Sequence, residues 1–200
     1  MRITAAMIIS HLEALSNPEA ALFAQRFFKT GAGEYAEGDR FRGIRVPVLR
    51  KMVPSLDGVP LLEIIRLLES AFHEDRLLAL FLLMRRFAKG DEPQRQQIHE
   101  LYLAHTKKIN NWDLVDVSAP HLVGAFLRHR DRSLLYRLVA STSLWERRIA
   151  IIATFHFIRN GEFEDTLALA ELLLDDSHEL LHKATGWMLR EVGKGTSAQA

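Results

Sequence analysis

Three stretches of this sequence share an alanine that is followed eleven residues later by a glycine. The pairs are Ala79–Gly90, Ala150–Gly161 and Ala184–Gly195. The alanines are 71 and 34 residues apart, which indicates a unit of about 35 residues, a length typical of helix-pair repeats. Stacked helix pairs form a curved slab with a concave inner surface. We therefore predict an all-α helical-repeat solenoid, and a generic bundle with chance similarity among its helices is the alternative.

Apolar residues recur at helical spacing along most of the sequence, without the strand-like alternation that precedes hairpin turns. The predicted helices span residues 61–68, 76–88, 94–105, 133–140, 145–159, 163–174 and 178–192. Residues 193–195 are predicted to end the last helix because they contain two glycines. Residues 30–43 hold four glycines and are expected to form a long loop, after which Pro47 can open a short helix ending near Pro54.

Composition narrows the class of protein. The 200 residues suffice for one domain with a sizeable core, and we predict a single domain over 1–200 with a short tail at 196–200. The chain has no cysteine, which excludes disulfides, thiolate zinc sites and cysteine nucleophiles. His11 and Glu13 interrupt the first apolar stretch, so it is not a signal peptide, and no apolar run is long enough to span a membrane. A cytoplasmic location is expected.

Charge bears on the possible partners. The formal net charge is +1, which argues against a protein that coats nucleic acid through bulk charge alone. One stretch is locally basic and is opposed only by Asp39. Its basic residues are Arg40, Arg42, Arg45, Arg50 and Lys51. Local patches matter more than totals for DNA binding, so this stretch is a candidate contact.

Two short motifs combine aromatic and charged residues. In residues 110–116, Asn110 or Asn111 is suited to cap a helix, and Trp112 and Asp116 share a helix face because they are four residues apart. A core Trp112 with a solvated Asp116 is the alternative. In residues 145–148, Arg148 stands near the start of a predicted inner helix, where a guanidinium can hold a phosphate.

The alternative for Arg148 is a surface salt bridge with Glu146 or a neighbouring helix. In the repeat alignment Arg148 matches Arg76 only approximately, because it falls one position off. A third motif places Lys183, Trp187 and Arg190 on one helix face. That face suits an aromatic platform flanked by phosphate contacts, whereas an inward Trp187 with a basic surface is the alternative.

Residues 178–182 match a zinc-protease pattern, with His178 and His182 four residues apart and a glutamate between them. A catalytic zinc needs a third protein ligand, and no histidine follows His182. We therefore interpret this segment as the start of a helix capped by Asp176 or Ser177, and predict neither a metal nor a cofactor. A zinc hydrolase is the weaker hypothesis.

Four segments together resemble one known family, the AlkD-like DNA alkylation repair enzymes. The segments are residues 33–47, 111–116, 145–150 and 183–191, and they follow the family's order and spacing over about residues 20–193. The resemblance implies HEAT-like helix pairs around a concave face that holds DNA. Family members usually continue with another basic helical segment, which this sequence lacks after Val192.

By motif, the resemblance implies that Asp116 is the catalytic carboxylate and that Trp112 and Trp187 lie beside the damaged nucleotide. It implies that Arg148 holds the DNA backbone near the lesion. The predicted DNA contacts are Lys183, Arg190, Arg147 and Arg45.

The implied activity is that of a monofunctional DNA glycosylase, a hydrolase of N-glycosyl bonds in base excision repair. Its substrates would be cationic N3- and N7-alkylpurines, such as 3-methyladenine and 7-methylguanine, in double-stranded DNA. The protein is expected to be a monomer and to avoid membranes. A non-catalytic repeat module that binds branched DNA or a protein partner is the alternative.

Overall fold

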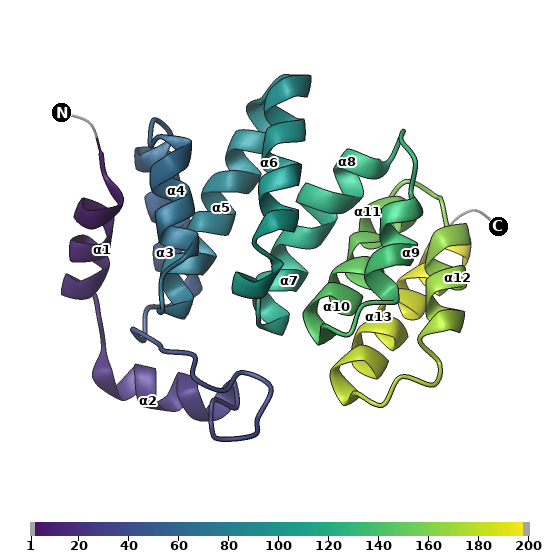
Figure 1. The fold of residues 1–200 in the computed structure, drawn as a ribbon, viewed down its shortest axis with the longest axis horizontal. Coiled ribbons are helices and arrows are strands. Elements are labelled where there is room, and N and C mark those ends of the chain that lie inside the picture. Colours follow the sequence, from purple (N-terminus) through teal and green to yellow (C-terminus); the bar gives the residue numbers. More distant parts are fainter. Residues whose placement is uncertain (1–2, 198–200) are drawn as a thin grey trace. The chain divides into compact units, whose positions relative to one another are not determined.

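The computed structural model describes residues 3–197, and α-helices make up most of this part of the chain (Figure 1). The α-helices are α1 (Ala5–Ala14), α2 (Pro18–Phe27), α3 (Val46–Met52), α4 (Leu61–Leu68), α5 (His73–Lys89), α6 (Glu92–Ala104), α7 (Trp112–Ala119), α8 (Ala125–Leu127), α9 (Ser133–Val139), α10 (Leu144–Ala153), α11 (Phe155–Ile158), α12 (Glu164–Leu172) and α13 (Glu179–Ser197). Short 3₁₀ segments are η1 (Val53–Leu56) and η2 (Thr106–Lys108), and η3 (Pro120–Gly124) is π-helical. The all-α prediction is confirmed. No helix in the described part is both long and apolar enough to cross a membrane.

The described chain divides into two compact units. Unit 1 holds residues 3–94 and 108–114, and unit 2 holds residues 95–107 and 115–197. The predicted single domain stays a prediction. The three alanines that define the repeat are all buried, as expected for a shared packing position.

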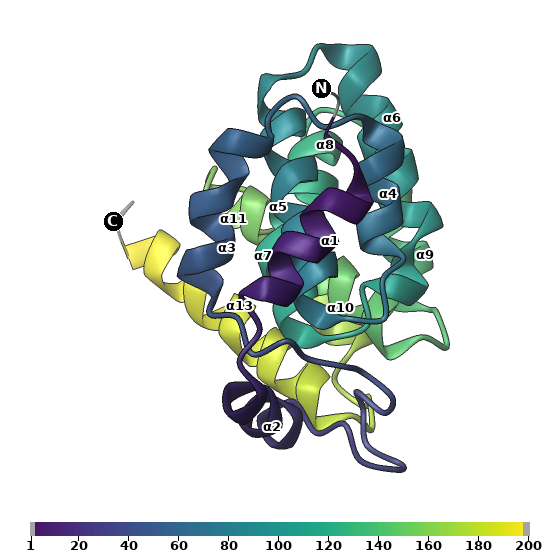
Figure 2. The same ribbon diagram turned by 90° about the vertical axis from the view of Figure 1, so that its left-hand side faces the viewer.

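Unit 1 is built around α5. Helices α3 and α4 pack against α5, and α1 packs against α4, as Figure 2 shows from the side of α1. Every residue from His73 to Leu83 is buried, so the first half of α5 has no solvent face. Its polar side chains must therefore find partners inside the protein.

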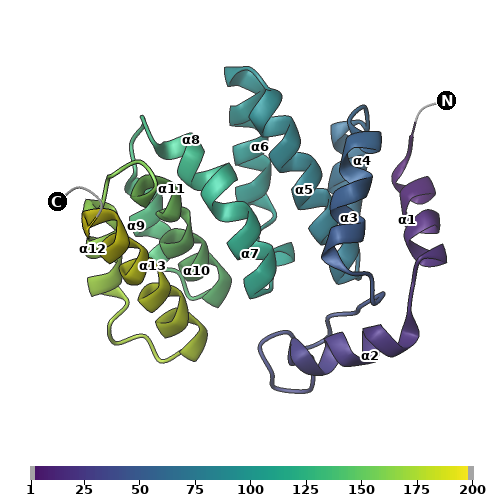
Figure 3. The same cartoon turned by 180° about the vertical axis from the view of Figure 1, so that it is seen from behind.

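Unit 2 is built around α10 in the same way. Helices α9 and α13 pack against α10, and α11 packs against α13 (Figure 3). The residues from Arg148 to Ala153 are buried. Both units thus bury one helix between its neighbours, as helix-pair repeats do.

Two predicted helix boundaries are wrong. The helix predicted over 145–159 is divided at Thr154, whose buried hydroxyl donates to the Ile151 carbonyl oxygen at 2.7 Å and competes with the regular helical bonds. Helix α13 does not end at Val192 but runs through Gly195 to Ser197. The ring of Phe163 packs close to Gly195, and this tertiary contact offsets the low helix propensity of glycine. Residues 198–200 of the predicted tail lie outside the described residues.

The π-helical segment η3 begins at Pro120, which has no N–H to continue the α-helical bonding of α7. Its last residue, Gly124, packs against the end of α10. A Cβ at Gly124 would clash with the Ala153 carbonyl oxygen and lie 2.8 Å from the His156 Cβ. The close approach of these helices therefore requires a glycine.

Gly124→Ala is expected to lower the free energy of unfolding by about 2–3 kcal/mol, because neither backbone can yield without strain. Urea denaturation followed by circular dichroism would measure the change. Gly58→Ala is the control, because a Cβ there meets nothing within 4 Å. Equal denaturation midpoints for the two variants would contradict this packing.

Candidate functional site

Asp116 and Arg148 form a buried pair in unit 2. Asp116 lies one turn into α7, and Arg148 lies in the first half of α10. The Nε and Nη2 atoms of Arg148 donate to the two Asp116 oxygens at 2.9 and 2.8 Å. The Nη1 atom donates to the carbonyl oxygen of Leu180. The side chain of Arg148 is 6% exposed and that of Asp116 is 17% exposed, so this is not a surface salt bridge. The fork fixes the plane of the carboxylate.

Glu146, the alternative partner of Arg148, is engaged elsewhere. Its carboxylate accepts hydrogen bonds from the hydroxyls of Thr106 at 2.7 Å and Ser141 at 2.5 Å. Two separate sequence motifs contain Asp116 and Arg148. Their contact could not be predicted from the sequence, because 32 residues lie between them.

A contact pattern repeats at the same 71-residue interval in both units. A serine hydroxyl donates to the acid five residues later: Ser70 to Asp75 at 2.7 Å and Ser141 to Glu146 at 2.5 Å. The arginine after each acid donates back to the serine carbonyl oxygen. These contacts are Arg76 to Ser70 at 3.1 Å and Arg147 to Ser141 at 3.0 Å.

The repeat partner of Arg76 is therefore Arg147, and the sequence comparison of Arg76 with Arg148 was one position off. Arg147 also donates to Asp176 at 2.7 Å, so its guanidinium connects α10 to the segment before α13. The unit 1 residue that corresponds to Arg148 is Leu77, a core residue. Arg148 thus places a charge where unit 1 has an apolar side chain.

Trp187 lies in α13, also in unit 2, and is half-buried. Its ring is 5.6 Å from the ring of Phe155, and the guanidinium of Arg159 lies 5.3 Å from the Phe155 centroid. Glu191, one turn further along α13, accepts a hydrogen bond from Lys194 at 2.8 Å, and this bond lowers the pKa of its carboxyl. The Trp187 ring therefore packs against Phe155 and is only partly buried.

Lys183 and Arg190 lie on α13, four residues before and three residues after Trp187. Both side chains are exposed, at 64% and 67%. Lys183 pairs with Glu179, and Arg190 lies 3.8 Å from Glu191. Because α13 is continuous, the predicted single face with Trp187 between two cations is retained.

Trp112 belongs to an aromatic cluster in unit 1. Its backbone N–H donates to the side-chain oxygen of the preceding residue, Asn111, at 2.8 Å. The ring stacks on Phe28 with centroids 5.3 Å apart and meets the edge of Phe27 at 6.1 Å. Phe27 is 57% exposed, so the cluster reaches the surface of unit 1.

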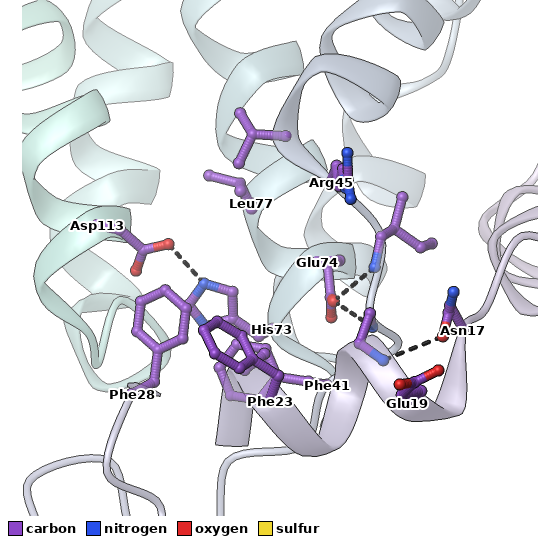
Figure 4. A pocket seen from close by; sticks show the side chains of 15 residues that line it. Asn17, Glu19, Phe23, Phe28, Phe41, Arg45, His73, Glu74, Leu77 and Asp113 are labelled. Carbon is purple, nitrogen blue, oxygen red and sulfur yellow. Dashed lines mark hydrogen bonds and ion pairs between the residues drawn. The ribbon is translucent and has the colours of Figure 1, made fainter. Parts of the chain in front are cut away.

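Behind this cluster, His73 bonds to a carboxylate through each ring nitrogen. Its Nε2 lies 2.8 Å from Asp113 and its Nδ1 lies 3.1 Å from Asp39 (Figure 4 shows the Asp113 bond). Burial lowers the pKa of His73, but Asp113 and then Asp39 outweigh burial and raise it to about 9. The imidazolium therefore joins α5 to the start of α7 within unit 1. No local sequence pattern indicates this contact, because 40 residues separate His73 from Asp113.

The raised pKa of His73 predicts how stability depends on pH. The pKa of His73 lies above its ordinary value of 6.5 in the folded protein. Its contribution to the free energy of unfolding is therefore complete below about pH 6.5 and is lost as the pH rises towards 9. We expect a loss of about 2–3 kcal/mol over this range. Urea midpoints measured from pH 6 to 9 should fall steeply for wild type and much less for His73→Asn. The exposed His129→Asn should keep the wild-type slope, and parallel curves for all three proteins would contradict the assignment.

Arg45 precedes α3 at the surface of unit 1 and lines a cavity there. The structure therefore distributes the predicted site residues over both units. Asp116, Arg148, Arg147 and the α13 residues lie in unit 2, whereas Trp112 and Arg45 lie in unit 1.

The histidines of the zinc-like motif have other partners. The Leu180 N–H donates to Nδ1 of His178 at 3.2 Å, and Nε2 of His182 bonds to the Asp176 carbonyl oxygen. Between residues 3 and 197, no group of three or more potential ligands is arranged to hold a metal ion.

The fold, together with the charged and aromatic side chains, defines an all-α helical-repeat protein. This is the class of protein to which the sequence motifs point. Residues 8–200 match the family of DNA alkylation repair enzymes, and the chain belongs to that family. Its fold is similar to that of a predicted DNA alkylation repair enzyme from Enterococcus faecalis, with a TM-score of 0.64 and 16% sequence identity over 91% of this chain and 85% of that chain. No curated protein matches the sequence. The family resemblance and the helical-repeat fold are thereby confirmed.

Proposed function

We propose that this protein is a monofunctional DNA glycosylase that hydrolyses the N-glycosidic bond of cationic N3- and N7-alkylpurines in duplex DNA. The observation that carries the proposal is the Asp116 carboxylate held in a fork by Arg148, in a chain that belongs to the alkylation repair family. Such a carboxylate is oriented before substrate arrives.

One carboxylate is sufficient for this reaction. An alkylated purine with a positive charge already has a weakened glycosidic bond, so no general acid is needed, unlike in sugar hydrolases that use two carboxyl groups. Asp116 stabilises the cationic sugar as the base leaves and orients the attacking water. At about 4 Å and an effective dielectric constant near 20, the attraction is on the order of 4 kcal/mol. Realised in the transition state, it accelerates the reaction by about a thousandfold.

The fork from Arg148 holds the Asp116 carboxylate in one orientation through both of its oxygens. The Asp116 side chain also retains some exposure, so a sugar and a water molecule have access to it. We assign Arg148 a positioning role towards Asp116, in addition to its predicted contact with the DNA backbone.

The tryptophans are proposed to select the lesion. An aromatic face favours a cationic base over a neutral one by about 1–2 kcal/mol. Trp187 is supported by Phe155 in unit 2, and Trp112 is supported by Phe28 in unit 1. Both rings are half-buried, which leaves part of each available to a ligand.

Lys183, Arg190 and Arg45 are exposed, and we propose them as phosphate contacts. Arg147 was predicted to join them, but its bonds to Asp176 and to backbone carbonyl oxygens favour a structural role. We propose further that the protein acts as a cytoplasmic monomer without a cofactor, over a single functional domain.

The test is the release of 7-methylguanine and 3-methyladenine from methylated duplex DNA, measured by chromatography of the free bases. We expect release well above the spontaneous rate. Tight binding to branched DNA without base release would contradict a glycosylase and favour the non-catalytic alternative. Stoichiometric zinc in the purified protein would support the hydrolase hypothesis based on His178 and His182.

A further inference from the structure

A cavity of about 640 Å³ opens in unit 1 between α2, residues 41–46 and the first turn of α5 (Figure 4). Its volume lies within the range of small-molecule sites. It does not include Asp116 or Arg148, which belong to unit 2. Three aromatic and three aliphatic side chains form much of its lining: Phe23, Phe28, Phe41, Ile44, Val46 and Leu77.

The wall of this cavity is built from fixed backbone. The Glu74 carboxylate accepts the N–H groups of Arg42 at 2.8 Å, Gly43 at 2.7 Å and Ile44 at 3.1 Å. Gly43 has a φ of 77°, and a Cβ there would clash with the Asn17 carbonyl oxygen, so the chain bends tightly against the start of α2. The cavity is therefore formed before any ligand binds.

Aromatic surface is exposed at the cavity. Phe23 lines the cavity and stacks on Phe27 with ring centroids 6.4 Å apart, yet its side chain is 71% exposed, which is unfavourable for an aromatic ring in water. Base–aromatic stacking is the usual way in which proteins bind unpaired nucleobases. A flat heterocycle against Phe23 would remove this ring from water.

Polar groups lie at opposite sides of the lining. Figure 4 shows Asp113 and Phe28 on one side and Arg45 on the other. Asp113 accepts bonds from His73 and from the Leu114 N–H, which leaves lone pairs for the N–H groups of a ligand. Arg45 is exposed and has no ion-pair partner within the described chain, so its guanidinium is available to an anion.

We propose that this cavity binds a single nucleotide residue, with its base against Phe23, base N–H groups towards Asp113 and its phosphate on Arg45. The source in DNA is a nucleotide turned out of the duplex, which exposes both its base and its phosphate. This source rests on the proposed function, whereas the binding of the free nucleotide does not. Glu19 lies on the same side as Arg45 and weakens the binding of a phosphate.

The cavity is connected to Trp112 through one ring. Phe28 lines the cavity and stacks on Trp112 at 5.3 Å. A base in the cavity should therefore shift the indole N–H signal of Trp112 in NMR spectra of the full chain. The Trp112→Phe variant assigns that signal, and titration with deoxyguanosine monophosphate should saturate it with a Kd on the order of 0.1–1 mM.

Substitutions of exposed residues distinguish the contribution of base stacking from that of the phosphate contact, and they should not unfold the protein. Phe23→Ala should raise the Kd of both deoxyguanosine and its monophosphate by about tenfold, as loss of a stacking face does. Arg45→Gln should weaken the binding of the monophosphate and leave the binding of the nucleoside unchanged. Glu19→Gln should strengthen the binding of the monophosphate. Leu22→Ala and Lys51→Gln, at exposed positions outside this lining, are the matched controls.

DNA probes distinguish a nucleotide that is part of DNA from a free nucleotide as the natural ligand. Wild type should prefer a duplex with one unpaired guanine to the fully paired duplex, and Phe23→Ala should lose this preference. If Phe23→Ala affects the free nucleotide alone, the ligand is a free nucleotide and the DNA source is wrong. Absence of saturable nucleotide binding, or equal losses in Phe23→Ala and Leu22→Ala, would overturn the site. None of these measurements requires base release, so they can fail while the glycosylase stands.

Discussion

Replacement of Asp116 by asparagine is expected to lower the rate of base release from methylated duplex DNA by about a thousandfold. The amide keeps the size of the side chain but removes the negative charge that stabilises the cationic sugar. Affinity for undamaged DNA should change little, because the loss falls on the transition state. Single-turnover release of 7-methylguanine, with DNA binding measured in parallel, would check both expectations.

Loss of the Asp116 charge also breaks the fork with Arg148, so a control must separate stability from chemistry. Asp176→Asn disrupts the neighbouring pair with Arg147, whose side chains are 17% and 10% exposed and thus similarly sheltered. It should reduce the free energy of unfolding by an amount comparable to Asp116→Asn but retain base release. Equal release by wild type and Asp116→Asn would refute the catalytic assignment.

Arg42→Met is expected to lower the free energy of unfolding by about 3–5 kcal/mol. Arg42 donates through Nε and Nη2 to the two oxygens of Asp75 at 2.6 and 2.9 Å, and the two side chains are 4% and 0% exposed. The guanidinium also lies 4.0 Å from the ring centroid of Phe72. Its removal leaves a carboxylate deep in unit 1 without a counter-charge. Urea denaturation followed by circular dichroism would measure the loss.

An exposed arginine–aspartate ion pair provides the matched control for this experiment. Arg85 makes the same two-atom contact with Asp57, but the side chains are 34% and 41% exposed. Arg85→Met should therefore cost less than about 1 kcal/mol. Combining Arg42→Met with Asp75→Leu should recover much of the loss, because no charge is then stranded. A similar cost for the two single variants would show that burial does not control these pairs.

Local sequence patterns located the helices because the spacing of apolar residues reflects which face of a helix is buried. The helix predicted over residues 61–68 is α4, and Asn111 directly precedes the first residue of α7. The 71-residue interval identified a real packing position, since Ala79 and Ala150 are both buried in equivalent helices. The same interval contained the serine–acid–arginine contacts, which the alanine–glycine comparison did not reveal.

Tertiary packing decided the features that local patterns cannot contain. Thr154 divides a continuous apolar pattern, and Phe163 allows α13 to continue through Gly195. A glycine lowers helix propensity by about 1 kcal/mol, a bias that one packing contact can reverse.

The motif residues themselves were visible in the sequence, because aromatic and charged side chains on one predicted face stand out from an apolar repeat. Their partners were not. Asp116 meets Arg148 and His73 meets Asp113 across 32 and 40 residues, through helices brought together by the stacking of the repeat. The sequence by itself thus determined most of the helices, the repeat and the family. Only the tertiary structure decided which charges are paired, because pairing depends on how helices pack and not on their spacing along the chain.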